Sequence, residues 1–89
     1  MGRQKHRLLY MRIDRHMTIM EMDELLSLAE MSGMTKDKRV RETQVARLDA
    51  LVAMAVTGYP TNMADEIRSL VRDIGVLAAR RAALEAMVQ

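Results

Sequence analysis

The stretch MADEIRSLVRDIGVLAARRAALEAMV, residues 63–88, decides the fold of this 89-residue chain. Its apolar residues recur at alternating spacings of four and three, the pattern of a heptad seam along one face of a helix. The positions of this seam are Met63, Ile67, Leu70, Ile74, Leu77, Arg81, Leu84 and Val88. One column is mostly β-branched and the other holds methionine and leucine, which favours the pairing of two helices. We therefore expect a helix over residues 62–88 and a homodimer.

Arg81 is a charged residue in a core position of this seam. Such a residue lowers stability but can set helix register, and its side chain can reach water or Glu85, four residues further on. Val71 and a series of alanines make the apolar stripe wider than two columns. A wide stripe leaves two arrangements open, a coiled coil between two chains or a hairpin within one chain. In the hairpin the seam packs on Val45, Leu48, Val52 and Ala55.

The composition is that of one small domain, residues 1–89, with a thin core. The chain has no Trp, Phe or Cys and ten methionines, so methionine takes part of the place of aromatic side chains. The absence of cysteine excludes disulfides and fits the cytoplasm. No apolar run approaches the roughly 20 residues of a membrane span. We therefore expect a cytoplasmic protein that does not enter a membrane.

Capping and turn residues divide the chain into a tail, a leader and three helices. Thr18 and Glu21 fit a capping box, Gly33 suits a helix end, and Thr35 is placed to cap the next helix. Gly58-Tyr59-Pro60 ends that helix, and Thr61 or Asn62 caps the last one. The expected segments are a basic tail over 1–7, a leader over 8–17, and helices over 18–32, 35–57 and 62–88. The predicted class is all-α or nearly so, a helical hairpin or bundle.

The leader, residues 8–17, fits either a short strand or a helix. As a strand it places Leu9, Met11, Ile13 and Met17 on one side and Tyr10, Arg12, Asp14 and His16 on the other. As a helix it would continue towards the helix that begins at Thr18. A strand this short must pair with another chain, because its backbone groups are otherwise left without partners.

With a strand at residues 9–17, the chain resembles a ribbon-helix-helix DNA-binding domain over about residues 9–55. The positions that carry the resemblance are Leu25, Leu28, Ala29, Gly33-Met34-Thr35, Val40-Arg41-Glu42 and Val45. Two basic blocks on either side of an acidic helix, within a net charge of +2, are compatible with nucleic-acid contact. The resemblance implies a non-enzymatic, dimeric DNA-binding regulator or accessory factor.

In that family the paired strands enter the major groove of duplex DNA and the start of the second helix holds phosphate. The resemblance then implies groove contacts by Arg12 and His16, with Tyr10 beside them, and phosphate contacts by Thr35, Lys36 and Lys38. Three departures stand against it. Asp14 would repel the DNA backbone, Thr43 stands where alanine is usual, and the helix over 62–88 lies outside the minimal fold.

The alternative function is a small helical protein-binding adaptor, chaperone or inhibitor, including viral inhibitors and antiactivators. In this interpretation the leader is helical and another protein binds a methionine-rich surface, because methionine side chains adapt to varied partners. The methionines concerned are Met11, Met17, Met20, Met22, Met31 and Met34. Filling of a core that lacks large aromatic side chains explains the same residues without a partner.

The sequence contains no pattern of catalytic or metal-binding residues. His6 and His16 are not spaced as ligands on adjacent helical turns. The glycines form no phosphate-binding loop, and no serine has a histidine at a recognisable spacing. Paired carboxylates such as Asp65-Glu66 fall in the first turn of a helix, where the helix dipole explains them. We expect no catalytic activity, no metal and no cofactor.

Overall fold

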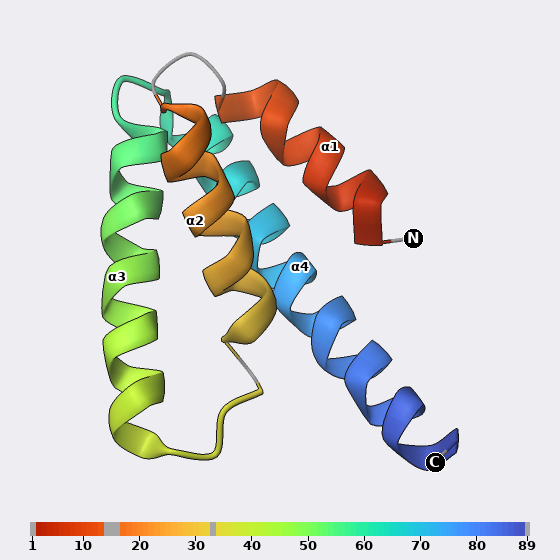
Figure 1. Ribbon diagram of the computed structural model, residues 1–89. Helices are drawn as coiled ribbons and strands as arrows, with labels where there is room; N and C mark the ends of the chain where they lie inside the picture. Colours follow the sequence, from red (N-terminus) through yellow and green to blue (C-terminus); the bar gives the residue numbers. More distant parts are fainter. Residues whose placement is uncertain (1, 14–16, 33, 89) are drawn as a thin grey trace.

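The computed structural model describes residues 2–13, 17–32 and 34–88 as a compact all-helical bundle (Figure 1). Its four helices are α1 (Gly2–Ile13), α2 (Ile19–Met31), α3 (Lys38–Val56) and α4 (Thr61–Val88). The described part of the chain contains no strand. The all-α prediction is therefore confirmed.

The strand alternative for the leader is wrong over its described residues, because α1 runs without a break to Ile13. Leu9 and Ile13, four residues apart, are both fully buried, whereas Met11 between them is 70% exposed. A strand would have put all three on one face, so the burial follows the helical period. The expected basic tail is also helical from Gly2 onward. Residues 14–16, which include His16, lie outside the described residues.

Helix α2 begins as the capping box predicts. The Thr18 hydroxyl accepts a hydrogen bond from the Glu21 N–H at 3.1 Å, and the Glu21 carboxylate accepts one from the Thr18 N–H at 2.9 Å. Free N–H groups of the first turn are thereby satisfied from both sides. Met22 in the next turn is buried, and Met17 packs against the core from the connection before the helix.

The start of α3 corrects the prediction that Thr35 caps it. The cap is Asp37, whose carboxylate accepts hydrogen bonds from the N–H groups of Arg39 and Val40. Thr35 instead accepts a hydrogen bond from the N–H of Asp37 at 3.3 Å. An aspartate competes well with threonine for this position, and the helix therefore begins at Lys38.

The turn between α3 and α4 agrees in part with the prediction from Gly58-Tyr59-Pro60. Gly58 has a positive φ of 84°, a conformation that glycine adopts without the strain of a Cβ. Helix α4 then begins directly after Pro60, whose carbonyl accepts the Ala64 N–H at 2.9 Å. Thr61 is thus the first helical residue, one position earlier than the sequence predicted and with no described side-chain cap.

The core lies around the first half of α4, which packs on α1 and α2 and to a smaller extent on α3 (Figure 1). Its residues come from all four helices: Leu9, Ile13, Met22, Leu25, Leu26, Ala29, Leu48, Leu51, Val52, Ala55, Ile67, Leu70, Val71 and Ile74. The end of α2 approaches α4 closely at Gly75, where an added Cβ would lie 2.8 Å from the carbonyl oxygen of Ala29. Glycine there permits the contact between the two helices.

The predicted heptad seam is divided between two environments. Ile67, Leu70 and Ile74 are buried in the bundle, and Met63 and Leu77 are half-buried. Leu84 and Val88 are 63% and 88% exposed, and Figure 1 shows the end of α4 projecting beyond the other helices. We call residues 77–88 the α4 tail.

The hairpin alternative, in which the seam packs on the preceding helix, holds only for part of the first half of α4. Leu48, Val52 and Ala55 of α3 are buried, as that arrangement expects. Val45 is a correction, because its side chain is 39% exposed, and Val40 is 44% exposed. The start of α3 therefore lies outside the core, since α4 packs mainly on α1 and α2.

Candidate functional site

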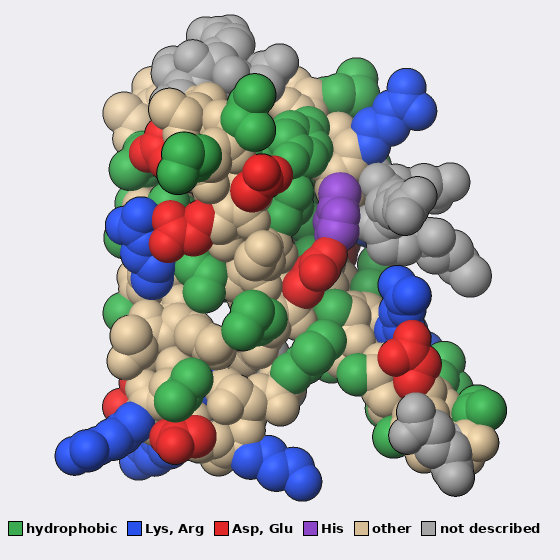
Figure 2. All heavy atoms as spheres, viewed as in Figure 1, with side chains coloured by type: hydrophobic (Ala, Val, Ile, Leu, Met, Phe, Trp, Pro, Cys, Tyr) green, Lys and Arg blue, Asp and Glu red, His purple; other side chains and the backbone are tan. Residues whose placement is uncertain are grey.

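Acidic, basic and apolar side chains are interspersed over the face of the molecule seen in Figure 2. Many of the charged groups are occupied by contacts between helices, so their partners decide which of them are available to a ligand.

Two residues expected to face a DNA groove are engaged within the bundle. The Arg12 guanidinium donates to Glu66 of α4 at 2.9 Å, and its backbone carbonyl accepts from the Tyr59 hydroxyl. The Tyr10 hydroxyl donates to Asp23 of α2 at 3.0 Å. Burial, followed by this bond to a carboxylate, raises the pKa of Tyr10. These side chains hold α1 on its neighbours, and the expected third member, His16, lies outside the described residues.

The expected phosphate contacts remain at one end of the bundle. Lys36 and Lys38 are exposed, as are Arg39 and Arg41 in the first turn of α3. In the part of the chain that the structure describes, none of these four cations has an acidic side chain within ion-pair distance. The structure thus keeps a basic cluster at residues 36–41 without the strand that the DNA-binding family combines with it.

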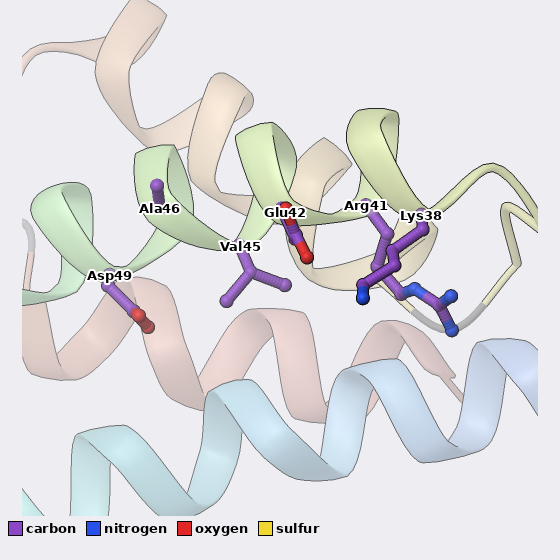
Figure 3. A pocket seen from close by; sticks show the side chains of 6 residues that line it. All are labelled: Lys38, Arg41, Glu42, Val45, Ala46 and Asp49. Atoms are coloured by element: carbon purple, nitrogen blue, oxygen red, sulfur yellow. The ribbon is translucent and has the colours of Figure 1, made fainter.

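A shallow hollow extends from this cluster along α3 (Figure 3). Most of its side chains extend to the same side of the helix. They are Lys38, Arg41, Glu42, Val45, Ala46 and Asp49. Since the hollow contains two carboxylates as well as two cations, it does not form a uniformly positive pocket for a phosphate.

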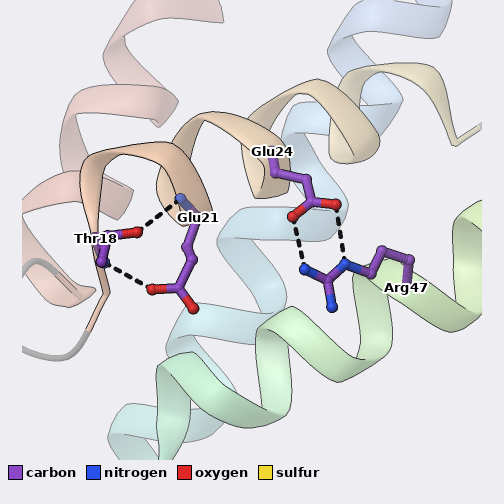
Figure 4. Close-up of polar contacts among 4 residues, drawn as sticks. All are labelled: Thr18, Glu21, Glu24 and Arg47. Atoms are coloured by element: carbon purple, nitrogen blue, oxygen red, sulfur yellow. Dashed lines mark hydrogen bonds and ion pairs between the residues drawn. The ribbon is translucent and has the colours of Figure 1, made fainter.

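The acidic residues of α2 are all engaged in holding the fold. Figure 4 shows Glu21 in the capping box and Glu24 bound through both oxygens to Arg47 of α3, at 2.8 and 2.9 Å. The hydrogen bond from the Thr18 N–H lowers the pKa of Glu21, and the bonds from Arg47 lower the pKa of Glu24. Both pKa shifts are therefore caused by contacts that hold the fold.

The remaining two acidic residues of α2 bind α1. Asp23 accepts from Tyr10, and Glu30 lies 2.8 Å from Nε2 of His6. Each carboxylate of this helix thus has a partner, which is the helix's own cap for Glu21 and another helix for Asp23, Glu24 and Glu30.

The methionines that the sequence grouped do not form one surface. Met22 is 2% exposed and Met17 is half-buried, so both belong to the core. Met20 is 82% exposed near the start of α2, and Met31 is 45% exposed at its end. Eleven residues of helix separate these two by about 16 Å. Met11 is exposed on α1, and Met34 follows Met31 beyond the end of α2.

The three most exposed large apolar residues of the first two helices are two at the start of α2 and one on α1. We call them the α1–α2 apolar surface: Met11 at 70%, Ile19 at 78% and Met20 at 82% exposure. Ile19 lies on the face of α2 that meets α1, because Asp23, one turn later, binds Tyr10.

The sequence predicted two members of this surface, Met11 and Met20, and missed Ile19. A signal for Ile19 was present, since two large apolar residues follow the cap at Thr18 before the core spacing of the helix begins at Met22. Residues in the first turn after a cap that fall outside the core spacing point to solvent.

Within residues 2–13, 17–32 and 34–88, no group of three or more His, Asp and Glu side chains is arranged to hold a metal ion. No helix in the same ranges has both the length and the apolarity needed to cross a bilayer.

Comparisons with protein-family models, with curated proteins and with solved structures find no match to this chain.

Proposed function

We propose that this protein is a non-enzymatic helical adaptor or inhibitor that binds an apolar helix of another protein through the α1–α2 apolar surface. The observation that carries the proposal is the exposure of Ile19 and Met20, 78% and 82%, in consecutive positions of one helical turn. Burial of such side chains by a partner removes apolar area from water and stabilises a complex.

The surface is held in place by contacts that need no partner. The capping box fixes the turn that presents Ile19 and Met20, and the contacts of Tyr10 and His6 hold α1 beside it. A binding surface that is already ordered loses less conformational freedom on association. The two methionines add side chains that adjust to the shape of the partner.

The chemistry of the surface favours an apolar, helical partner. The carboxylates of α2 are already paired, so a cationic segment would find no free acidic residue on that helix. An amphipathic helix presents apolar anchors at spacings of three and four residues. Such a stripe suits a surface to which two neighbouring helices contribute.

The test is to identify the partner and measure its affinity for defined variants. A photo-crosslinking amino acid at position 20, in cells that encode the chain, should capture the partner for identification by mass spectrometry. Titration calorimetry with the purified partner should then show that Ile19→Ser and Met20→Ser each weaken binding by about tenfold or more.

Met54→Ser is the matched control, because Met54 is an exposed methionine on α3, away from this surface. It should bind the partner as the wild type does. Equal affinity of the wild type and an Ile19→Ser/Met20→Ser double variant, with an unchanged circular dichroism spectrum, would contradict the proposal.

A second candidate function is contact with duplex DNA, favoured by the exposed basic cluster at residues 36–41. This cluster lies at the beginning of α3, where the helix dipole also favours an anion. Such contact would concern the phosphate backbone, because Arg12 and Tyr10 are engaged within the bundle.

Fluorescence anisotropy with a duplex tests this candidate directly. Affinity should fall steeply with salt, and a Lys36→Ala/Lys38→Ala variant should weaken binding and reduce the salt dependence. Arg80→Ala, which removes an exposed cation from α4, should have a smaller effect. Absence of binding at about 50 mM salt would exclude this function.

A further inference from the structure

The α4 tail continues the heptad seam beyond the end of the bundle. The seam positions Leu84 and Val88 are 63% and 88% exposed, and Arg81 is the seam residue between Leu77 and Leu84. Figure 2 shows the tail as a separate lobe with an open notch between it and the rest of the molecule. The pattern that buries Ile67 and Ile74 is therefore repeated where none of the four described helices covers it.

We propose that the α4 tail binds the α4 tail of a second copy of this chain in an antiparallel orientation. The occupant is a second copy because the tail carries the continuation of a regular heptad seam, and a heptad seam is complementary to another of the same spacing. This pairing uses a different part of the molecule from the α1–α2 apolar surface.

The arrangement of the bundle decides the orientation. The first half of the seam is covered by α1 and α2 of the same chain, so a partner helix on the second half lies on the same side of α4 as the bundle. In a parallel pair, the first half of the partner's α4 would run into that bundle. In an antiparallel pair, each bundle lies beyond the end of the other tail, and the tails overlap without collision.

The overlap has a defined register. With Leu77 of one chain level with Val88 of the other, Arg81 of each chain lies level with Leu84 of the other. Each layer then combines residues from the two columns of the seam, as antiparallel pairing requires. The overlap of residues 77–88 is about 18 Å long, so we expect a weak dimer that forms at high protein concentration.

The charges of the tail support this orientation. Arg81 donates from Nε to Glu85 of its own helix at 3.0 Å, so the two side chains share one flank of the seam. In an antiparallel pair, this flank of one helix lies against the same flank of the other helix. Glu85 of the second copy then lies beside Arg81, displaced from it along the helix axis by one residue. A parallel pair would instead place two Arg81 side chains in one layer and oppose their like charges.

The first experiment measures self-association of the full chain by sedimentation equilibrium up to about 1 mM. We expect a monomer–dimer equilibrium that Leu84→Asp weakens by about 100-fold, since a carboxylate would then lie in the seam. Ala83→Asp adds the same charge at an exposed position off the seam and should retain dimerisation. Circular dichroism should show equal folding of both variants.

The second experiment reports the orientation by disulfide formation, for which the chain offers a background without cysteine. Leu77→Cys and Val88→Cys variants, mixed in equal amounts and oxidised, should form the mixed dimer. Val88→Cys alone should not form a disulfide dimer, because two Val88 positions lie about 16 Å apart along an antiparallel pair.

Three results would overturn the proposal: a monomer at every concentration, a dimer that Leu84→Asp leaves intact, or efficient disulfide formation by Val88→Cys alone. A mixed disulfide together with loss of the dimer in Leu84→Asp supports it. None of these outcomes depends on the partner proposed for the α1–α2 apolar surface, so the two proposals fail or hold separately.

Discussion

The two halves of α4 carry the same heptad pattern in opposite surroundings. Ile67 and Ile74 in the first half are 0% and 2% exposed, whereas Leu84 and Val88 in the second are largely exposed. The spacing therefore determines which face of the helix is apolar, and the neighbouring helices determine whether that face is covered. Variants that act on one half only can test this difference.

The largest difference is expected from truncations of seam residues. Ile67→Ala should lower the free energy of unfolding by about 2–5 kcal/mol, because it leaves a cavity in the core. Leu84→Ala should change it by no more than about 0.5 kcal/mol, since the side chain is mostly in water. Urea denaturation at low protein concentration, where the chain is monomeric, measures both values.

Equal losses of unfolding free energy in these two variants would contradict the division of α4 into a buried first half and an exposed second half. The comparison needs the monomer, because dimerisation through the tail would add its own contribution to the stability of the wild type.

The next effect is expected at Gly75, which lies where α4 leaves the bundle. Gly75→Ala would place a Cβ 2.8 Å from the Ala29 carbonyl oxygen and 2.9 Å from the Ser32 hydroxyl. We expect a net loss of about 1–3 kcal/mol from the forced separation of α2 and α4, although alanine is the better helix former. A stability equal to or above that of the wild type in thermal unfolding would show that this contact is not close.

A change of pH is expected to have a smaller effect on the stability of the protein. This effect should come from contacts within the bundle and not from the α4 tail. The carboxylates of Glu21 and Glu24 have lowered pKa values in the folded protein because of their bonds to the Thr18 N–H and to Arg47. Their contribution is therefore present above the ordinary glutamate pKa of about 4.3 and is lost as the pH falls through the folded pKa.

Thermal unfolding between about pH 6 and pH 3 measures this contribution. Glu24→Gln should reduce the dependence on pH, whereas Leu84→Ala should leave it unchanged because the tail contacts neither carboxylate. An identical pH profile for Glu24→Gln and the wild type would show that the bond to Arg47 does not stabilise the fold.

The smallest effect on the monomer is expected when residues 80–89 are deleted. Arg81, Leu84 and Val88 contribute no buried side chain to the core, so the midpoint of thermal unfolding should remain within a few degrees of the wild type. Self-association by the proposed antiparallel pairing should disappear. A large loss of monomer stability would show that the tail supports the bundle.

Local signals in the sequence predicted most of the fold. The capping box at Thr18 and the turn at Gly58 are set by nearby residues, so both could be predicted from the sequence. The leader could not be settled in this way, because apolar residues at 9, 11 and 13 fit a strand, and only the burial of Leu9 and Ile13 without Met11 identifies a helix. The predicted start of α3 was wrong because two residues that can cap a helix, Thr35 and Asp37, lie within three positions of each other. The sequence alone did not decide between them.

The candidate site was less accessible to sequence reasoning. Methionine content alone does not separate Met22, in the core, from Met20, at the surface, since that depends on which face of α2 meets its neighbours. The ion pairs of Arg12 and Lys5 link residues that are 54 and 68 positions apart, a relation that no local pattern contains. The heptad seam likewise could not show that α1 and α2 cover only its first half.

The packing of α1 on α4 also has a consequence for the order of folding during synthesis. Lys5 and Asp73 are 68 positions apart, so α1 leaves the ribosome several seconds before the helix that buries Leu9 and Ile13 has been made. During that interval α1 cannot pack on α4. The oldest segment of the chain can therefore take its final place only after α4 has been made.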